Sequence, residues 1–445
     1  MAKSTEISVE TEETTEARNS VRAFLRKSWG WIHLFGTTAA AQAAIQVLSF
    51  ASGLIIVRTL PPPEYALYVL SLTIVGAMNI LADSGVTAGV MAEGGKQWRN
   101  RIWLGQVMAT GRKLRFRFAR IAAIVLIPIA AWLLVKHGAS WTTAGLLILA
   151  IFANFIVTLN CGLYSIPPAL HQRVFASIKI SLLQCIIRLG LTAILLLAFP
   201  NPFVAIITAA LAQYFVLGRI KKLGVGFVDY HENATDVIEA KILKMVKRRF
   251  PDCLYSCISG QITIWLATLY GSTLMIAQVG ALSRIGQLML VLSSITSLVL
   301  VPRFARLPNN PSLVTKRYFQ AQLVLAFSVG LVCFAIALFS RQCLWLLGAP
   351  YAGLGGEVLL MAAGAGVNVL SAAAFAMNIA RGFVPNPAIY IGMNILCQAL
   401  CIKWLNVGSI TGMFEFGIAM PLFNLVILSG YVTYSAYQAE AVDRE

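Results

Sequence analysis

The chain has 445 residues, of which 58% are hydrophobic and only 12% carry a charge. Soluble domains contain roughly 25% charged residues, so this composition excludes an ordinary soluble protein. The net charge of +17 does not indicate a nucleic-acid-binding protein, because the basic residues lie beside long apolar segments. At the start of the chain, the polar composition of residues 1–17 predicts a disordered segment. The helical spacing of apolar residues in 18–33 predicts an amphipathic helix at a membrane surface. Residues 1–33 are therefore expected to form a cytoplasmic tail.

Twelve apolar segments follow, and each is long enough to cross a bilayer, which requires about 20 mostly apolar residues. The first six are expected at 34–57, 65–92, 118–135, 142–160, 174–199 and 202–218. The second six are expected at 253–270, 273–302, 318–340, 354–380, 386–404 and 409–436. The spans at 65–92, 273–302 and 354–380 exceed the required length, which predicts that they are tilted, kinked or extend into the cytoplasm. The sequence therefore predicts an all-α polytopic membrane protein.

The spans divide into an N-terminal half, 34–218, and a C-terminal half, 253–436. A cytoplasmic linker at 219–252 separates them and contains an amphipathic helix that begins at Asp236, and 437–445 forms a short tail. The halves are weakly alike, since short polar and apolar patterns recur around Gln42 and Gln261. This pattern predicts two pseudo-symmetric six-helix repeats, as many transporters have.

The positions of lysine and arginine predict the orientation in the membrane. Of the 35 basic residues, 29 lie at the two termini or in every second connection between consecutive spans, or next to these segments. Four lie on the opposite side: Arg58, Lys136, Arg341 and Lys403. Because basic residues are retained in the cytoplasm, both termini are expected there, in a multi-pass protein of the bacterial inner membrane.

Neither a metal site nor an enzyme is expected. The eight cysteines lie largely in apolar segments and the four histidines are scattered, whereas zinc sites require clustered ligands. The sequence contains no nucleotide-binding loop and no nucleophile elbow. We therefore expect no cofactor and no catalytic residue.

The two basic residues inside spans, Arg188 and Arg284, are the strongest indication of a binding site. An arginine in the hydrocarbon region costs about 3 kcal/mol or more, so each is expected to face a protein-lined or watery cavity. Both lie roughly 16 Å from the outer ends of their spans, given a rise of about 1.5 Å per residue. Two cations at one depth suit a diphosphate, which arginine binds bidentately. The structural alternative is that both bind helix-end carbonyls and hold the halves together.

Several glutamines accompany these arginines at helical spacing. They are candidates for binding sugar hydroxyls in a central cavity, and their alternative role is packing between helices: Gln42, Gln46, Gln184, Gln261 and Gln287. Asp83 lies near the inner end of its span. It is expected to cap a helix or pair with the adjacent basic loop, with ion coupling as the alternative.

The first hairpin resembles a known family. Arg58 and Leu60 end the first span, a Pro-Glu-aromatic turn follows at Glu64, and Asp83 precedes a glycine late in the second span. This pattern, together with Gly280 and Arg284 in the eighth span, resembles polysaccharide flippases of the multidrug/oligosaccharidyl-lipid/polysaccharide (MOP) exporter superfamily. The resemblance implies a MOP flippase fold, with Arg58 and Asp83 as candidates for coupling or gating.

The resemblance also implies a substrate and partners. The substrate would be an undecaprenyl-diphosphate-linked glycan, flipped from the cytoplasmic to the periplasmic leaflet for exopolysaccharide or O-antigen biosynthesis. Glycan polymerase and export machinery would be partners, together with membrane lipids. One alternative is a multidrug or cation antiporter of the same superfamily, which would call for acidic residues in the cavity. The other is a membrane glycan polymerase or ligase, which generally has a large outer loop that this chain lacks.

Overall fold

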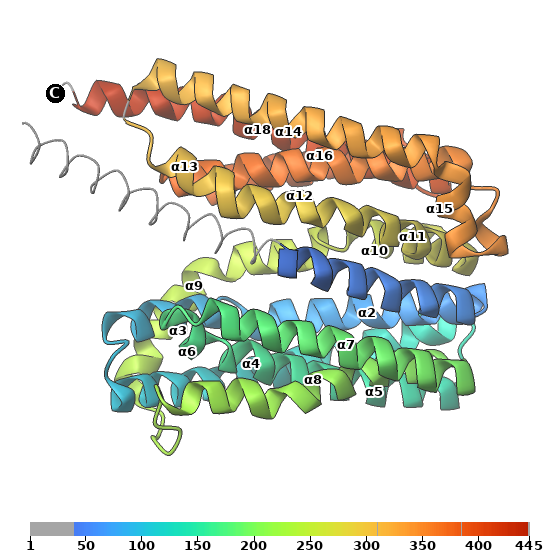
Figure 1. The fold of residues 1–445 in the computed structure, drawn as a ribbon, viewed down its shortest axis with the longest axis horizontal. Helices are drawn as coiled ribbons and strands as arrows, with labels where there is room; N and C mark the ends of the chain where they lie inside the picture. Colours follow the sequence, from blue (N-terminus) through green and yellow to red (C-terminus); the bar gives the residue numbers. More distant parts are fainter. Residues whose placement is uncertain (1–39, 309, 384, 444–445) are drawn as a thin grey trace, which may run out of the picture.

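A computed structural model describes residues 40–308, 310–383 and 385–443 (Figure 1). The tail and the amphipathic helix expected within 1–33 lie outside the described residues. Every regular element among the described residues is a helix, and the helices form two bundles that lie side by side. The predicted all-α class with two halves is confirmed.

The N-terminal bundle begins with the helix Ala40–Thr59. It continues with α2 (Pro62–Asp83), α3 (Val86–Lys96), α4 (Arg101–Lys136), α5 (Trp141–Tyr164), α6 (Ile166–Leu170), α7 (Val174–Ala198) and α8 (Pro202–Val225). The linker helix α9 (Asp236–Ser259) leads to α10 (Ile262–Tyr270), α11 (Thr273–Gly286), α12 (Leu290–Ile295) and α13 (Val301–Ala305). The C-terminal bundle then adds α14 (Pro311–Leu338), α15 (Ser340–Leu347), α16 (Gly355–Ala380), α17 (Pro387–Trp404) and α18 (Ile410–Asp443).

Local sequence accounts for where the long helices start. Proline occupies the first turn of α2, α8, α14 and α17, where its missing N–H costs nothing. The side chain of Asn100 caps α4 by accepting from the backbone N–H of Ile102 and Trp103, both at 3.1 Å. Ser140 and Ser272 cap α5 and α11 in the same way.

Ten helices among the described residues are long and apolar enough to cross a membrane. The two other expected spans correspond to the α9–α10 segment and to α17. The first is interrupted between Ser259 and Ile262, so neither piece alone is a full apolar span. The second carries a buried Asn394 and a half-buried Gln398, which make it less apolar.

The helices differ from the expected spans at three places. The long span expected at 65–92, for which a kink was one expectation, breaks at Ser84 and Gly85, which have positive φ angles of 41° and 87° and precede a second helix, α3. The linker helix and the first part of the span expected at 253–270 form the single helix α9, which continues through Pro251. The helix that contains the span expected at 118–135 begins earlier, at Arg101, because the basic segment before the span is also helical.

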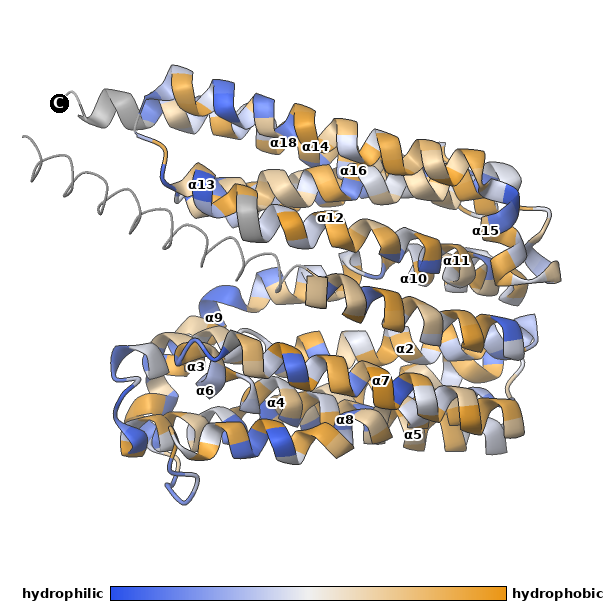
Figure 2. Cartoon of the chain, in the orientation of Figure 1, coloured by the Kyte–Doolittle hydropathy of each residue, from blue (hydrophilic) through white to orange (hydrophobic). Residues whose placement is uncertain are grey.

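The surface confirms a membrane environment. Large apolar side chains are exposed along the bundles, such as Ile124 on α4, Leu197 on α7 and Phe327 on α14, each more than 70% exposed. In Figure 2 hydrophobic residues cover the length of the helices, while hydrophilic residues gather at the end of the N-terminal bundle near α3 and α6. An apolar surface of this extent is stable when lipid covers it.

Candidate substrate site

The two bundles meet most closely along α2 and α11. Gly280 of α11 lies against Val69 of α2 so tightly that a Cβ added to Gly280 would be 2.4 Å from the Val69 Cγ2 atom. No larger residue fits there without a shift of one helix. This close approach fixes the position of Arg284, one turn further along α11.

Arg284 extends from the C-terminal half into the N-terminal half. Its Nε–H donates to the Tyr65 hydroxyl at 3.3 Å, and its guanidinium lies 5.9 Å from the centre of the Tyr68 ring. On the other side it covers Gly53 of the first helix, whose added Cβ would be 3.1 Å from Arg284 Cδ. The backward tilt of side chains on a helix directs the guanidinium toward the start of α2.

The charge of Arg284 has no carboxylate partner among the described residues. Tyr65 and Tyr68 contact the guanidinium through a hydroxyl and an aromatic ring, which orient it but supply no carboxylate. A partly buried cation of this kind favours binding of an anionic group. The guanidinium has already lost much of its water on folding, so this cost is not incurred again when the anion binds.

A cavity of about 590 Å³ lies in the C-terminal half. No acidic and no basic side chain occurs among the described residues of its lining, which include amides and hydroxyls: Tyr255, Ser259, Gln261, Thr263, Ser283, Gln287, Asn368, Ser371, Tyr390, Asn394, Gln398 and Asn424. Amides and hydroxyls both donate and accept hydrogen bonds, as sugar hydroxyls do. The described lining is therefore uncharged, with amides and hydroxyls set among a larger number of apolar side chains and glycines.

Interrupted helices form one wall of this cavity. The break between α9 and α10 places Gln261 in the lining, and Gln287 follows the end of α11, where 287–289 is a short 3₁₀ turn and 296–300 a π-helical turn. Non-helical backbone at membrane depth is tolerated where it faces protein or a cavity, and transporters use such breaks for binding. Gln261 also reaches the other half, since its Nε2 lies 3.6 Å from the Cβ position of Gly76 on α2.

The structure brings together only some of the residues predicted for the site. Gln261 and Gln287 share the cavity, whereas Arg284 lies at the boundary beside it and is not in its lining. Arg188 and Gln184 are half-buried on α7 of the N-terminal half, and the Arg188 Nε is buried without a hydrogen-bond partner among the described residues. Gln42 and Gln46 are half-buried on the first helix, which contacts α7 through Ser49 and Cys185. Their roles remain predictions.

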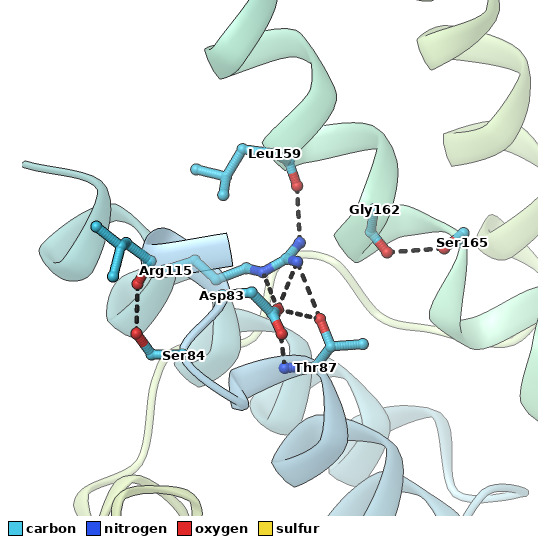
Figure 3. A network of polar contacts seen from close by, with 8 residues as sticks. Asp83, Ser84, Thr87, Arg115, Leu159, Gly162 and Ser165 are labelled. Atoms are coloured by element: carbon cyan, nitrogen blue, oxygen red, sulfur yellow. Dashed lines mark hydrogen bonds and ion pairs between the residues drawn. The ribbon is translucent and has the colours of Figure 1, made fainter. Parts of the chain in front are cut away.

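Asp83 forms an ion pair that the sequence did not assign to a particular residue (Figure 3). Its Oδ1 accepts from Arg115 Nη2 at 2.7 Å and from Arg115 Nε at 3.2 Å, and it also accepts from the Thr87 hydroxyl. Arg115 donates in addition to the Leu159 carbonyl at 2.8 Å and to the Thr87 hydroxyl at 2.9 Å. The network joins α2, α3, α4 and α5 at the end of the N-terminal half that the charge pattern predicts to be cytoplasmic, here called the inner end. A coupling role for Asp83 stays a prediction.

Arg115 could have been found from its place in a periodic stripe. The buried residues of α4 recur every three or four positions, and Arg115 occupies one of these positions: Leu104, Met108, Gly111, Arg115, Ala119 and Ala122. The surrounding cations lie off this stripe and are exposed or half-exposed, so only Arg115 is placed to meet the acid of α2.

Comparison with known proteins identifies the fold. No protein family matches the chain in sequence, and no curated protein matches it significantly. Solved structures of MATE transporters match in structure, among them the following three. An inward-facing multidrug resistance MATE family transporter of the MOP superfamily has a TM-score of 0.67 at 16% identity, over 90% of this chain and 96% of that one. A MATE in complex with MaD3S has 0.60 at 13% identity, over 93% and 96%. An outward-facing multidrug resistance MATE family transporter has 0.58 at 13% identity, over 92% and 96%. The chain has the MOP transporter fold.

Contacts between the halves of this MOP fold gather at the end that the charge pattern predicts to be periplasmic, here called the outer end. Arg58 donates to the carbonyls of Trp345 and Leu346 at 2.7 and 2.8 Å. His137, at the end of α4, contacts the Thr268 carbonyl at 3.1 Å and the Thr273 hydroxyl at 3.2 Å. In Figure 1 the described parts of the bundles lie farther apart at the opposite end, near α13.

Proposed function

We propose that this chain is a flippase that moves a polyprenyl-diphosphate-linked oligosaccharide from the cytoplasmic to the periplasmic leaflet. The two halves would alternate between an inward-facing arrangement and one open at the outer end. The observation that carries the proposal is the pairing of an uncharged cavity, rich in amides and hydroxyls, with a cation that has no carboxylate partner among the described residues. A neutral glycan would form hydrogen bonds in the uncharged cavity, and a diphosphate would bind the Arg284 guanidinium.

The chemistry of the cavity, and not its volume, favours this assignment over a cation antiporter. The cavity has the size of small-ligand sites, which lie between about 300 and 1,000 Å³. A cationic drug would be favoured by a carboxylate, and the cavity lining contains none. The polyprenyl chain would remain in the bilayer, where each buried CH₂ is stabilised by about 0.8 kcal/mol. The likeness to multidrug transporters concerns the fold.

The decisive experiment is export of lipid-linked glycan in cells that carry variants at matched expression. Arg284→Ala and Arg188→Ala should each lower the affinity for substrate about 10- to 150-fold, since a charge-assisted phosphate contact contributes on the order of 1.5–3 kcal/mol. Arg→Lys should restore export partly, because lysine keeps the charge but not the bidentate fork. Arg341→Ala, an exposed arginine on α15, is the matched control.

Three results would overturn the proposal. Full export by the combined Arg284→Ala and Arg188→Ala variant would show that the arginines are structural. Increased sensitivity to cationic drugs upon loss of the chain, with unchanged glycan export, would favour the antiporter. Glycan elongation by the purified chain would favour a polymerase, although the outer connections among the described residues are short.

We also infer that both termini are cytoplasmic, in the inner membrane of a bacterium, beside glycan polymerase and export machinery. Reporter fusions after Ser140, Pro200 and Gly271 should report the periplasm. Fusions after Gln97 and Glu232 should report the cytoplasm, because basic residues dominate those connections. Inverted results would reverse the direction of transport in the proposal.

A further inference from the structure

A second pocket, of about 330 Å³, lies in the N-terminal half, away from the substrate site. It is enclosed by α4, α5, α8 and the connection 226–235 that follows α8. We call it the basic pocket. The side chains that give it its character are three cations and three aromatic rings: Arg112, Lys113, Lys221, Phe116, Tyr164 and Tyr230.

The connection 226–235 is fixed over α4 by specific contacts. The backbone N–H of Asp229 donates to the Arg101 carbonyl at 3.1 Å, and that of Thr235 donates to the Thr110 hydroxyl at 3.1 Å. Gly105 permits the crossing, since a Cβ there would be 2.1 Å from the Asp229 carbonyl oxygen. The pocket is thus part of the folded structure and does not depend on a ligand.

Two cations of the basic pocket have no carboxylate within ion-pair distance in the described part of the chain: Arg112 and Lys221. Lys113 is paired with Glu239 at 2.7 Å, and the one carboxylate in the lining, Glu232, accepts from Gln106 at 3.3 Å. Lys221 is held 5.9 and 5.6 Å from the ring centres of Tyr164 and Tyr230. Burial raises the pKa of Tyr230 to about 12, so its hydroxyl stays protonated and the pocket keeps its positive charge.

Helix lengths place the basic pocket at the inner membrane interface. A helix crosses the hydrocarbon in about 20 residues. Counted from the outer end of α4 at Lys136, this distance ends near Phe116, one turn before Arg112. Counted from the outer end of α8 at Pro202, it ends near Lys221. Counted from the start of α5 at Trp141, it ends near Cys161, one turn before Tyr164.

The pocket also adjoins surface that faces lipid. On α8 the exposed apolar face that precedes Lys221 includes Tyr214 and Phe215, which are 63% and 59% exposed. On α4 exposed Ile121 and Ile124 lie on the outer side of Phe116. A molecule whose acyl chains lie along these faces would place its headgroup at the height of the cations, with the aromatic rings at the level where they are enriched in membrane proteins.

We propose that the basic pocket binds the phosphate headgroup of an anionic phospholipid from the inner leaflet. Arg112 and Lys221 would contact the phosphate, while Phe116 and Tyr164 would pack against the glycerol region. This site is separate from the one proposed for transport, and its existence does not depend on which substrate is carried.

The test is native mass spectrometry of the full chain in detergent, titrated with phosphatidylglycerol or phosphatidylcholine. We expect retention of phosphatidylglycerol, and a half-saturating concentration at least tenfold higher for the Arg112→Gln/Lys221→Gln variant, since each lost contact is charge-assisted. The matched control is Arg120→Gln/Lys222→Gln, which removes two exposed cations of the same helices outside the lining. Arg112→Lys should retain binding, which separates charge from folding.

Three outcomes would overturn the proposal. Equal retention of phosphatidylcholine would exclude headgroup charge as the basis of binding. Displacement of the lipid by millimolar inorganic phosphate would identify the site as one for free phosphate. An equal loss of phosphatidylglycerol in the control variant would show a diffuse electrostatic effect. If the double variant does not fold, Lys221→Gln alone, compared with Lys222→Gln, provides the same contrast.

Discussion

Arg115 and Arg284 are both largely enclosed by protein, yet their surroundings differ. Arg115, at the inner end of the N-terminal half, is held by Asp83, Thr87 and a backbone carbonyl, all of them oxygen acceptors in the same half. Arg284, at the boundary, contacts one tyrosine hydroxyl and one tyrosine ring from the opposite half.

The difference separates a structural charge from one available to a ligand. Asp83 neutralises Arg115, so this pair can rigidify the joint between α2 and α3 but has little remaining affinity for an anion. Arg284 lacks such a partner in the described part of the chain, and its cost in the membrane is offset when an anion binds. The predictions below break each side of this contrast in turn.

The largest effect is expected when the Arg115 network is broken. Arg115→Ala leaves Asp83 partly buried without its cation, which should lower the free energy of unfolding by about 2–4 kcal/mol, below the limit for fully buried pairs because Asp83 is partly exposed. Thermal unfolding in detergent measures it. Arg117→Ala, which removes an exposed cation 3.8 Å from Glu239, should cost less than about 1 kcal/mol. Equal unfolding temperatures for the two variants would refute the structural role.

The next largest effect is expected when the packing that positions Arg284 is disturbed. Gly280→Ala introduces a Cβ 2.4 Å from Val69 Cγ2, which should destabilise the protein by about 1–3 kcal/mol and reduce glycan export without changing any charge. Val69→Ala in the same chain should restore part of both losses. Gly330→Ala on α14, where nothing lies within 4 Å, is the control. If Gly280→Ala exports normally, the close approach of α2 and α11 is unnecessary for placing Arg284.

The contrast between the arginines also shows what sequence could predict. The spans were predictable because hydrophobicity over about 20 residues depends on composition alone. The identity of the partner of Asp83 depends on which of several neighbouring cations shares a face with it, and this required the buried stripe through Arg115. The interruption at Gly260 and Gln261 was missed because no proline marks it, and Asn394 and Gln398 of α17 were not singled out because only the fold places them in the cavity lining.

At the outer end, His137 is expected to make the contacts between the halves depend on pH. Burial lowers the pKa of His137, and the charge of nearby Lys136 lowers it further. When the halves separate, the exposed ring should regain its ordinary pKa of about 6.5, so protonation favours separation. The closed contacts are therefore strongest above pH 6.5 and weaken by about 1.4 kcal/mol per pH unit below it, until the lowered pKa is reached.

Distances between spin labels at Ser140→Cys and Ala349→Cys, in a background without the native cysteines, measure this opening. The population of longer distances should grow as the pH falls from 7.5 to 5.0. His137→Gln should abolish the change, because glutamine can keep both hydrogen bonds but does not titrate. His171→Gln, at the other end of the N-terminal half, should leave it intact. A pH response that survives in His137→Gln would assign it to another group.

The smallest effects are expected for the neutral residues of the first helix. Gln42 and Gln46 are half-buried and would contribute one hydrogen bond each to a sugar, worth about 1 kcal/mol, or roughly a fivefold change in affinity. Water can replace the neutral hydrogen bond of a half-exposed glutamine. The positive charge of Arg284 at the boundary between the halves cannot be replaced by water. Gln42→Ala and Gln46→Ala should therefore each reduce export mildly, measured against Gln320→Ala on the surface of α14. A loss from either that equals the loss from Arg284→Ala would mean that the first helix, and not the boundary cation, holds the substrate.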